Sequence, residues 1–180
     1  QISGGFVTTT DNRIVRVGTE KLDMIAPLLE QRLTNGERLA VVARFKSELD
    51  ALYRLAQSFH VPVFQIRGNM PKGQTRQEKD QAIRHDGPLI YILQPKTASL
   101  GIDLAFLSHM IWYSPTTSYV DFTQCCDRIA LSRRSTTFTY LLADGIDRLQ
   151  FEILQSDGQF LQAIQQSPER LFRNESRQGR

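Results

Sequence analysis

Short apolar runs alternate with longer helical patterns along most of this chain. We predict buried strands at 39–44, 61–66, 88–94, 109–114 and 136–142, because each is an apolar run of strand length. Helices are predicted between and around them, at 21–33, 47–59, 75–84, 118–134 and 147–164. Strands that alternate with helices indicate a three-layer α/β fold, with a mostly parallel sheet covered on both faces.

Finer features of the pattern predict where helices begin and which faces they bury. Ser47 to Asp50 and Thr75 to Glu78 have the spacing of capping boxes. We expect the helices at 118–134 and 147–164 each to turn an apolar face inward. In the first helix this face consists of Val120, Phe122, Cys125 and Ile129. In the second it consists of Leu149, Ile153, Leu154, Phe160, Leu161 and Ile164. Trp112 and Tyr113 fit a core strand better than a base-stacking surface.

The ends of the chain differ from its middle. Residues 1–20 are predicted to be an extended lead-in or a hairpin, residues 21–165 the folded domain, and residues 166–180 a basic tail. The tail arginines are more often a solvated terminus than a DNA site, although they could attract phosphates. Gln1 is not an initiator Met and QISGGF does not resemble a signal peptide, so we expect a piece of a longer protein.

Composition narrows the choice of function. The 180 residues suffice for one domain, and a net charge of +3 with a pI near 9.0 is compatible with nucleic-acid binding. No apolar run approaches the length that spans a bilayer. The adjacent Cys125 and Cys126 and the three dispersed histidines lack the spacing of metal ligands, so no metal site is predicted.

Loops that follow the predicted strands contain the residues of greatest chemical interest. In parallel sheets the functional groups gather at the carboxyl ends of the strands. Here those positions are occupied by Arg44-Phe45-Lys46, by Arg67-Gly68, by residues 96–99 and by residues 114–118. We therefore expect a binding surface along this edge of the sheet.

The loop KTASLGIDL has the composition of a phosphate-binding turn. Its small residues would let backbone N–H groups approach phosphate oxygens, and the hydroxyls of Thr97 and Ser99 would add donors. Gly101 would permit a close approach, and Asp103 could accept a hydrogen bond from a ribose hydroxyl. An ordinary turn that buries Leu100 and Ile102 fits the same residues equally well.

The helix that follows carries Gln124 and Arg128 four residues apart. This spacing places both side chains on one face of the helix. An arginine held beside a cleft could neutralise charge during phosphoryl transfer. Taken alone, Arg128 fits better as part of a solvated face on which it pairs with Asp127.

Taken together, the motifs resemble a known family. GGF…KL, LAVVARF, VFQIRG, LQPKTASLGIDL, MIWYSPTTSYVDFTQCCDRI and FTYLLADGIDRLQFEIL follow the order of the second RecA-like lobe of superfamily-two helicases and translocases. The Swi/Snf type, with its bacterial and phage members, is the most similar branch. The resemblance covers roughly residues 3–165, and TASLGIDL and Q-C-C-D-R are its most specific parts. It implies a RecA-like domain of the P-loop NTPase type.

The resemblance also implies roles for individual residues. The fifth motif of the family would assign Lys96, Thr97 and Ser99 to DNA, and Gly101 and Asp103 to the nucleotide. The sixth motif would make Arg128 an arginine finger, accompanied by Gln124. The fourth motif and the segment after it would place Arg44, Lys46, Arg67 and Gly68 on the DNA backbone.

One departure from the family pattern concerns the second arginine finger. Members usually carry His and then Arg two and three residues after the first finger, where this chain has Ala130 and Leu131. In a continuous helix Arg133 would point about 140° away from Arg128. Either Arg133 or Arg134 supplies the second finger from a loop, or finger function is weakened.

The sequence also lacks half of an ATPase site. No Gly-x-x-x-x-Gly-Lys-Ser/Thr is present, and no Asp-Glu pair follows a strand. The resemblance therefore implies ATP, with Mg²⁺ held mainly by an N-terminal RecA-like lobe of the same polypeptide, and duplex DNA bound through its backbone phosphates. We expect no membrane partner, no ATP hydrolysis by the isolated chain, and a cytoplasmic, nucleoid-associated location if the source is bacterial or phage.

Two alternative functions are also compatible with the sequence. A RecA-like lobe kept only for docking nucleic acid or protein is favoured by the Leu131 departure and disfavoured by Gln124, Arg128 and TASLGID. An unrelated Rossmann-like enzyme would need a Gly-rich turn after the first strand, where this chain has FKSE.

Overall fold

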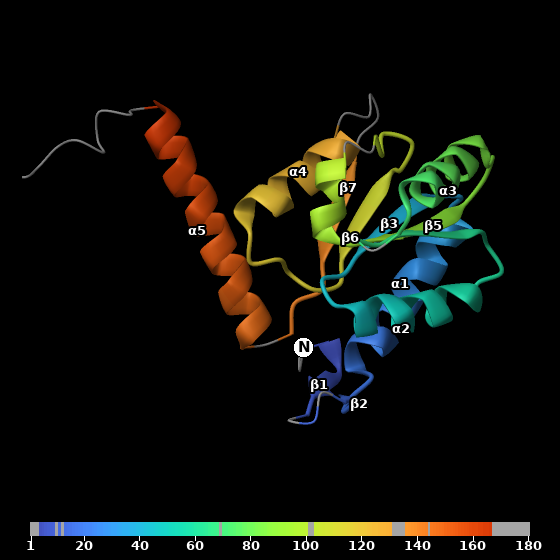
Figure 1. Cartoon of the computed structure of the whole chain (residues 1–180), viewed down its shortest axis with the longest axis horizontal. Helices are drawn as coiled ribbons and strands as arrows, with labels where there is room; N and C mark the ends of the chain where they lie inside the picture. Colours follow the sequence, from blue (N-terminus) through green and yellow to red (C-terminus); the bar gives the residue numbers. More distant parts are fainter. Residues whose placement is uncertain are drawn as a thin grey trace, which may run out of the picture.

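A computed structural model describes residues 4–9, 11, 13–68, 70–100, 103–130, 136–143 and 145–166. Its centre is a five-stranded sheet in the order β4-β5-β3-β6-β7, in which every neighbouring pair is parallel (Figure 1). The strands are β3 (Arg38–Val42), β4 (Val63–Ile66), β5 (Leu89–Leu93), β6 (His109–Trp112) and β7 (Thr137–Tyr140). The prediction of a mostly parallel α/β sheet is confirmed.

Helices cover both faces of this sheet. On one face lie α1 (Glu20–Thr34) and α2 (Lys46–Gln57), and on the other lie α3 (Lys72–Arg84) and α4 (Tyr119–Ala130) (Figure 1). A short 3-10 helix, η2 (Pro95–Leu100), follows β5, and α5 (Ile146–Gln166) stands beside α4 at the end of the described chain. The three layers were predicted, whereas the 3-10 helix was not.

Each face of the sheet has its own apolar core, because successive strand side chains point to opposite faces. Leu39 and Val41 of β3 join Ile25 and Leu29 of α1 on one face. Ala40 and Val42 join Cys125 and Ile129 of α4 on the other face. All these side chains are at most 1% exposed. Trp112 and Tyr113 are buried as well, one in each core, as predicted.

The N-terminal residues form a hairpin. Strand β1 (Phe6–Thr8) pairs antiparallel with β2 (Ile14–Arg16), and the Tyr113 hydroxyl donates to the Gly4 carbonyl oxygen. Gly5 has φ of 82°, and a side chain there would meet the carbonyl oxygen of Gly18. Glycine is therefore needed where the hairpin closes against the chain that leads into α1.

Both predicted capping boxes are wrong in position. Helix α2 begins one residue before Ser47, and the Glu48 carboxylate accepts a hydrogen bond from the Phe45 N–H at 3.2 Å. Helix α3 begins at Lys72, so Thr75 lies inside its first turn and its hydroxyl donates to the Pro71 carbonyl oxygen. The Glu48 side chain is buried in the fold, and the four-residue sequence pattern of a capping box does not indicate this burial.

The predicted inward faces of the last two helices need correction. Val120 of α4 and Leu149 and Ile153 of α5 are 55%, 51% and 52% exposed, whereas Leu154 is buried. Helix α5 contacts the body through the face that carries Phe151 and Leu154. It packs beside the end strand β7 and α4 instead of over the centre of the sheet, so only a narrow stripe is covered (Figure 1). Phe160, Leu161 and Ile164 lie outside the described side chains.

Candidate nucleic-acid and nucleotide interface

The loop between β3 and α2, together with the first residue of α2, places two cations at the carboxyl edge of the sheet. Lys46 is exposed at the first position of α2. Arg44 is half-buried, with its guanidinium carbon 5.0 Å from the centre of the Phe45 ring. Such stacking restricts the side chain while leaving the edge of the guanidinium free to donate hydrogen bonds.

The loop after β4 is occupied by internal contacts. The Arg67 guanidinium donates to the Asp50 carboxylate at 2.5 Å and to the Gln65 side-chain oxygen at 2.6 Å. Its charge is therefore paired in this conformation, and binding a phosphate would require it to share or leave Asp50. The neighbouring Gly68 is exposed, and its N–H donates to the Gln94 side chain at 3.0 Å.

The turn after β5 bends into η2 and uses Thr97 internally. Thr97 is 3% exposed, and its hydroxyl donates to the Gln94 carbonyl oxygen at 2.5 Å. In this conformation the hydroxyl does not face outward, so a phosphate contact would require it to turn away from Gln94. Lys96 beside it is exposed. The Ser99 side chain and Gly101 lie outside the described residues, while Asp103 is exposed and accepts from the Ala105 N–H at 2.8 Å.

Helix α4 presents Gln124 and Arg128 on one side, as predicted from their spacing. Gln124 is exposed and Arg128 is half-buried in the last turn. The Arg128 carbonyl oxygen accepts from the Leu104 N–H at 3.2 Å, and α4 packs against η2. Within the described part of the chain, no carboxylate lies within ion-pair distance of the Arg128 guanidinium. Its charge is therefore available to a ligand, and the expected pair with Asp127 is not formed.

The question of a second finger depends on Leu131, Arg133 and Arg134. These residues lie outside the described part of the chain.

Helix α4 is described from Tyr119 to Ala130. Its first turn is capped by Ser118, whose hydroxyl oxygen accepts from the Asp121 N–H at 3.2 Å. This cap fixes where the helix begins after the buried turn at Ser114 to Thr116.

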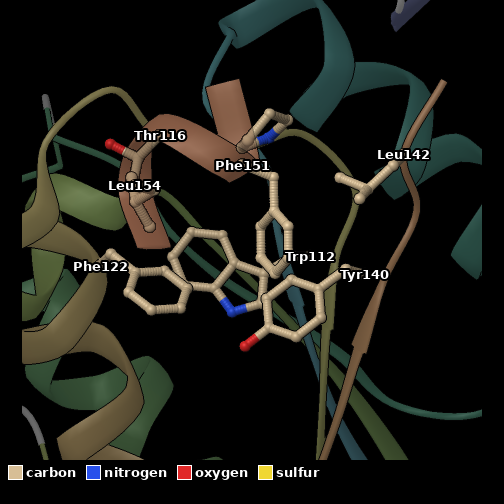
Figure 2. Close-up of a pocket in the computed structure, with 8 residues that line it drawn as sticks. Trp112, Thr116, Phe122, Tyr140, Leu142, Phe151 and Leu154 are labelled. Carbon is tan, nitrogen blue, oxygen red and sulfur yellow. The ribbon is translucent and has the colours of Figure 1, made fainter. Parts of the chain in front are cut away.

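An aromatic cluster joins α4 to the end of the sheet and to α5 (Figure 2). The Phe122 ring lies 5.1 Å from Trp112 and 6.2 Å from Tyr140, and Tyr140 lies 4.7 Å from Phe151. Thr116, Leu142 and Leu154 complete a narrow apolar crevice between them. The cluster packs α4 against β6 and β7, and its apolar lining suits packing better than ligand binding.

Three polar side chains meet at the carboxyl edge. Glu48 and Gln94 were not singled out from the sequence, whereas Ser114 begins the predicted segment 114–118. Ser114 accepts from the Arg44 N–H at 2.8 Å and donates to the Glu48 carboxylate at 2.7 Å. Glu48 is fully buried, and burial raises the pKa of its carboxyl group, while the bonds from Ser114 and Phe45 act in the opposite direction. Gln94 bonds to both Arg44 and Gly68. Serine, glutamate and glutamine in a loop or at a helix start give no sequence signal for such a network.

The described residues offer neither a metal centre nor a membrane-spanning helix. Among them, no group of three or more His, Cys, Asp and Glu side chains could hold a metal ion. No helix in that same part of the chain is long and apolar enough to cross a lipid bilayer.

Comparison with known proteins identifies the class to which this fold and these motifs belong. The architecture is that of a RecA-like helicase lobe, and residues 20–133 match the family described as Helicase conserved C-terminal domain. The chain belongs to this family and is a C-terminal lobe of the superfamily-two helicase type.

A known relative agrees with this assignment. The chain is 24% identical over 127 residues to DNA repair and recombination protein RAD54B of Gallus gallus, a match that covers 69% of this chain and 13% of that protein. The chain therefore spans a small part of that relative's length.

Solved structures share the fold at low sequence identity. The C-terminal part of the Fun30 ATPase domain has a TM-score of 0.69 at 20% identity, covering 74% of this chain and 44% of that one. T4 UvsW has a TM-score of 0.57 at 14% identity, covering 72% of this chain and 28% of that one. Domain 2 of the Mss116p DEAD-box helicase, solved with an RNA duplex, has a TM-score of 0.57 at 8% identity. This match covers 68% of this chain and 49% of that one.

Proposed function

We propose that this lobe is the second half of a DNA-dependent ATP-driven translocase or helicase of the Swi/Snf-like branch. It would contribute a DNA-phosphate surface and the arginine finger Arg128, while a first lobe would hold ATP and Mg²⁺. The observation that carries the proposal is the placement of Gln124 and Arg128 on α4, packed against the segment that follows β5. Family membership supports the same conclusion.

Arg128 fits the chemistry required of a finger. Arg128 is half-buried, and its guanidinium meets no carboxylate among the described residues, so its charge could neutralise a triphosphate presented from another lobe. The Leu104–Arg128 hydrogen bond and the aromatic cluster behind α4 hold the backbone of the helix in place. A rigid support is useful because transition-state stabilisation depends on preorganised charge.

For the DNA surface we propose Arg44, Lys46 and Lys96 as cations at the carboxyl edge, with Arg67 joining once it releases Asp50. The Ser99 hydroxyl would add a donor, and so would the Gly68 N–H and the Thr97 hydroxyl once they release Gln94. Such contacts read no bases, so binding should be largely independent of sequence and sensitive to salt. The docking-module alternative keeps this surface and lacks finger function, as the Ala130-Leu131 sequence would allow.

Binding of the 180-residue chain to a fluorescent DNA duplex at several salt concentrations tests the DNA surface. Lys46→Ala and Arg44→Ala should each weaken binding for all sequences and lower the slope of log K against log salt by about 0.9, the loss of one phosphate contact. Arg54→Ala, an exposed arginine near the other end of α2, is the matched control and should change neither. Equal losses in all three variants would contradict the proposed surface.

A further inference from the structure

A continuous chain of hydrogen bonds runs across the carboxyl edge of the sheet. The Gly68 N–H donates to Gln94 Oε1 at 3.0 Å, and Gln94 Nε2 donates to the Arg44 carbonyl oxygen at 3.2 Å. The Arg44 N–H donates to Ser114 Oγ at 2.8 Å, and the Ser114 hydroxyl donates to Glu48 Oε2 at 2.7 Å. The Phe45 N–H also donates to Glu48 Oε2, at 3.2 Å.

The order of these residues follows the order of the strands. Gly68 follows β4, Gln94 follows β5, Arg44 follows β3 and Ser114 follows β6, and the sheet has the order β4-β5-β3-β6. The chain of bonds therefore links the ends of four adjacent strands through side chains, just beyond the point where the backbone ladder stops. The backbone of Arg44 is held at both its N–H and its carbonyl oxygen.

Donor and acceptor chemistry fixes the direction of every bond. Arg44 N–H can only donate, so Ser114 must accept there and use its one proton toward Glu48. Reversing the Gln94 amide would set an NH₂ against the Gly68 N–H and an oxygen against the Arg44 carbonyl. Glu48 Oε2 accepts both of its bonds, while Oε1 is buried without a partner among the described residues. Any proton on Glu48 would therefore reside on Oε1 and leave the chain of bonds intact.

Gln94 is the centre of this arrangement. Its backbone N–H donates to the Ile66 carbonyl oxygen at 3.3 Å, and its own carbonyl oxygen accepts from the Thr97 N–H at 3.0 Å. All four of its hydrogen-bonding groups thus engage three different segments of the proposed DNA surface. A side chain and backbone bonded in this way fix the relative positions of the segments that they join.

We propose that Gln94 is a positioning residue that couples the Arg44–Lys46 loop to the Arg67–Gly68 loop and to η2, so that the proposed phosphate contacts are set as one unit. This rests on the DNA surface proposed above. Because the Gly68 N–H is held by Gln94 Oε1, a phosphate that takes this N–H must displace the amide. Displacement would release the Arg44 carbonyl oxygen one step along the chain of bonds.

The test measures amide hydrogen exchange by NMR at Arg44, Phe45 and Gly68 in the 180-residue chain. In Gln94→Leu the Gly68 amide should exchange faster by up to about tenfold, the loss of one hydrogen bond. The Arg44 amide should also exchange faster, although its own partner Ser114 is unchanged. Ser114→Ala removes the direct partner of the Arg44 amide, so this amide should exchange faster. The Gly68 amide should also exchange faster, although its own partner Gln94 is unchanged. Ser58→Ala, which removes a hydroxyl bond at the far end of α2, is the control and should change none of these amides.

Independent local bonds would give a different result. If Gln94→Leu changes Gly68 only and Ser114→Ala changes Arg44 and Phe45 only, the coupling is refuted. Should Gln94→Leu fail to fold, Gln94→Glu keeps an acceptor for Gly68 and loses the donor to Arg44. It should then retain Gly68 protection and loosen Arg44, and unchanged exchange at Arg44 would overturn the proposal.

Binding of duplex DNA separates this inference from the function on which it rests. Gln94→Leu should weaken binding and lower the salt slope by about 0.9, because one phosphate contact is no longer positioned. A structural effect alone would lower the unfolding midpoint without changing the slope, and that result would refute a positioning role. If the wild-type chain binds no duplex, the proposed DNA surface fails, and amide exchange still decides whether the loops are coupled.

Discussion

Lys21 and Asp147 form a buried ion pair whose disruption should strongly destabilise the lobe. Their side chains are 5% and 2% exposed. Lys21 Nζ donates to the Asp147 carboxylate and, at 2.7 Å, to the Tyr113 carbonyl oxygen. Asp147 also accepts from the Ala143 N–H at 3.2 Å. One ammonium thus joins α1, the end of β6 and the first turn of α5.

Replacing Lys21 with Met keeps most of the stem and removes the charge. Asp147 would then stay buried with a single N–H partner, a situation that costs about 3–5 kcal/mol. That is a large part of the roughly 5–15 kcal/mol by which a domain of this kind is stable. Removing both charges in Lys21→Met/Asp147→Leu should cost less than Lys21→Met alone, because no unpaired charge is left buried.

Urea unfolding of the 180-residue chain measures these differences, followed by circular dichroism and by the fluorescence of Trp112, the one tryptophan in the sequence. Arg76→Met is the matched control, since Arg76 is 86% exposed and lies 3.9 Å from Asp80 on the surface of α3. Its midpoint should not change measurably. A loss below about 1 kcal/mol for Lys21→Met, or a double variant less stable than the single one, would refute the reasoning.

Three further outcomes follow from burial. Burial lowers the pKa of His109 below its usual 6.5, so on acidification the unfolded chain takes up the proton first; stability should fall as the pH drops below about 6.5, and His109→Gln should flatten that fall. Burial raises the pKa of Cys126 to about 12 and raises that of Cys125 further. Because the thiolate is the reactive form, iodoacetamide at pH 8 should label both cysteines slowly until urea unfolds the chain. Fast labelling of the folded chain would contradict their burial. Leu149→Gln should change stability by less than about 0.5 kcal/mol, whereas Leu154→Ala should cost about 2–5 kcal/mol, and similar losses would contradict the placement of α5.

Most of the fold could be predicted because its strands are buried on both faces. Continuous apolar runs such as Leu89 to Leu93 are typical of strands that lie between two layers of helices, and the helices that connect them favour parallel pairing. Helix ends and exposed faces were harder to predict. Val120 and Leu149 are apolar yet exposed, because the sequence does not say how much of a helix its neighbours cover.

The site divides in the same way. Gln124 and Arg128 could be placed on one face because helical spacing is fixed by geometry. The contacts of Gln94, Ser114 and Glu48 could not be predicted, since they join residues that are far apart in the sequence and depend on the order of strands in the sheet. Thr97 shows the limit most clearly, because a hydroxyl in a phosphate-type loop turned inward to Gln94.

Arg128 is the residue on which the proposed function depends most. The decisive measurement is ATP turnover, with and without duplex DNA, by the protein that joins this lobe to a first lobe, compared with its Arg128→Ala variant and an Arg54→Ala control. We predict DNA-stimulated turnover that survives Arg54→Ala and falls about 10³-fold or more in Arg128→Ala, with a smaller change in the KM for ATP. DNA-stimulated turnover unchanged by Arg128→Ala would contradict the finger assignment, and a complete absence of turnover would favour a docking module.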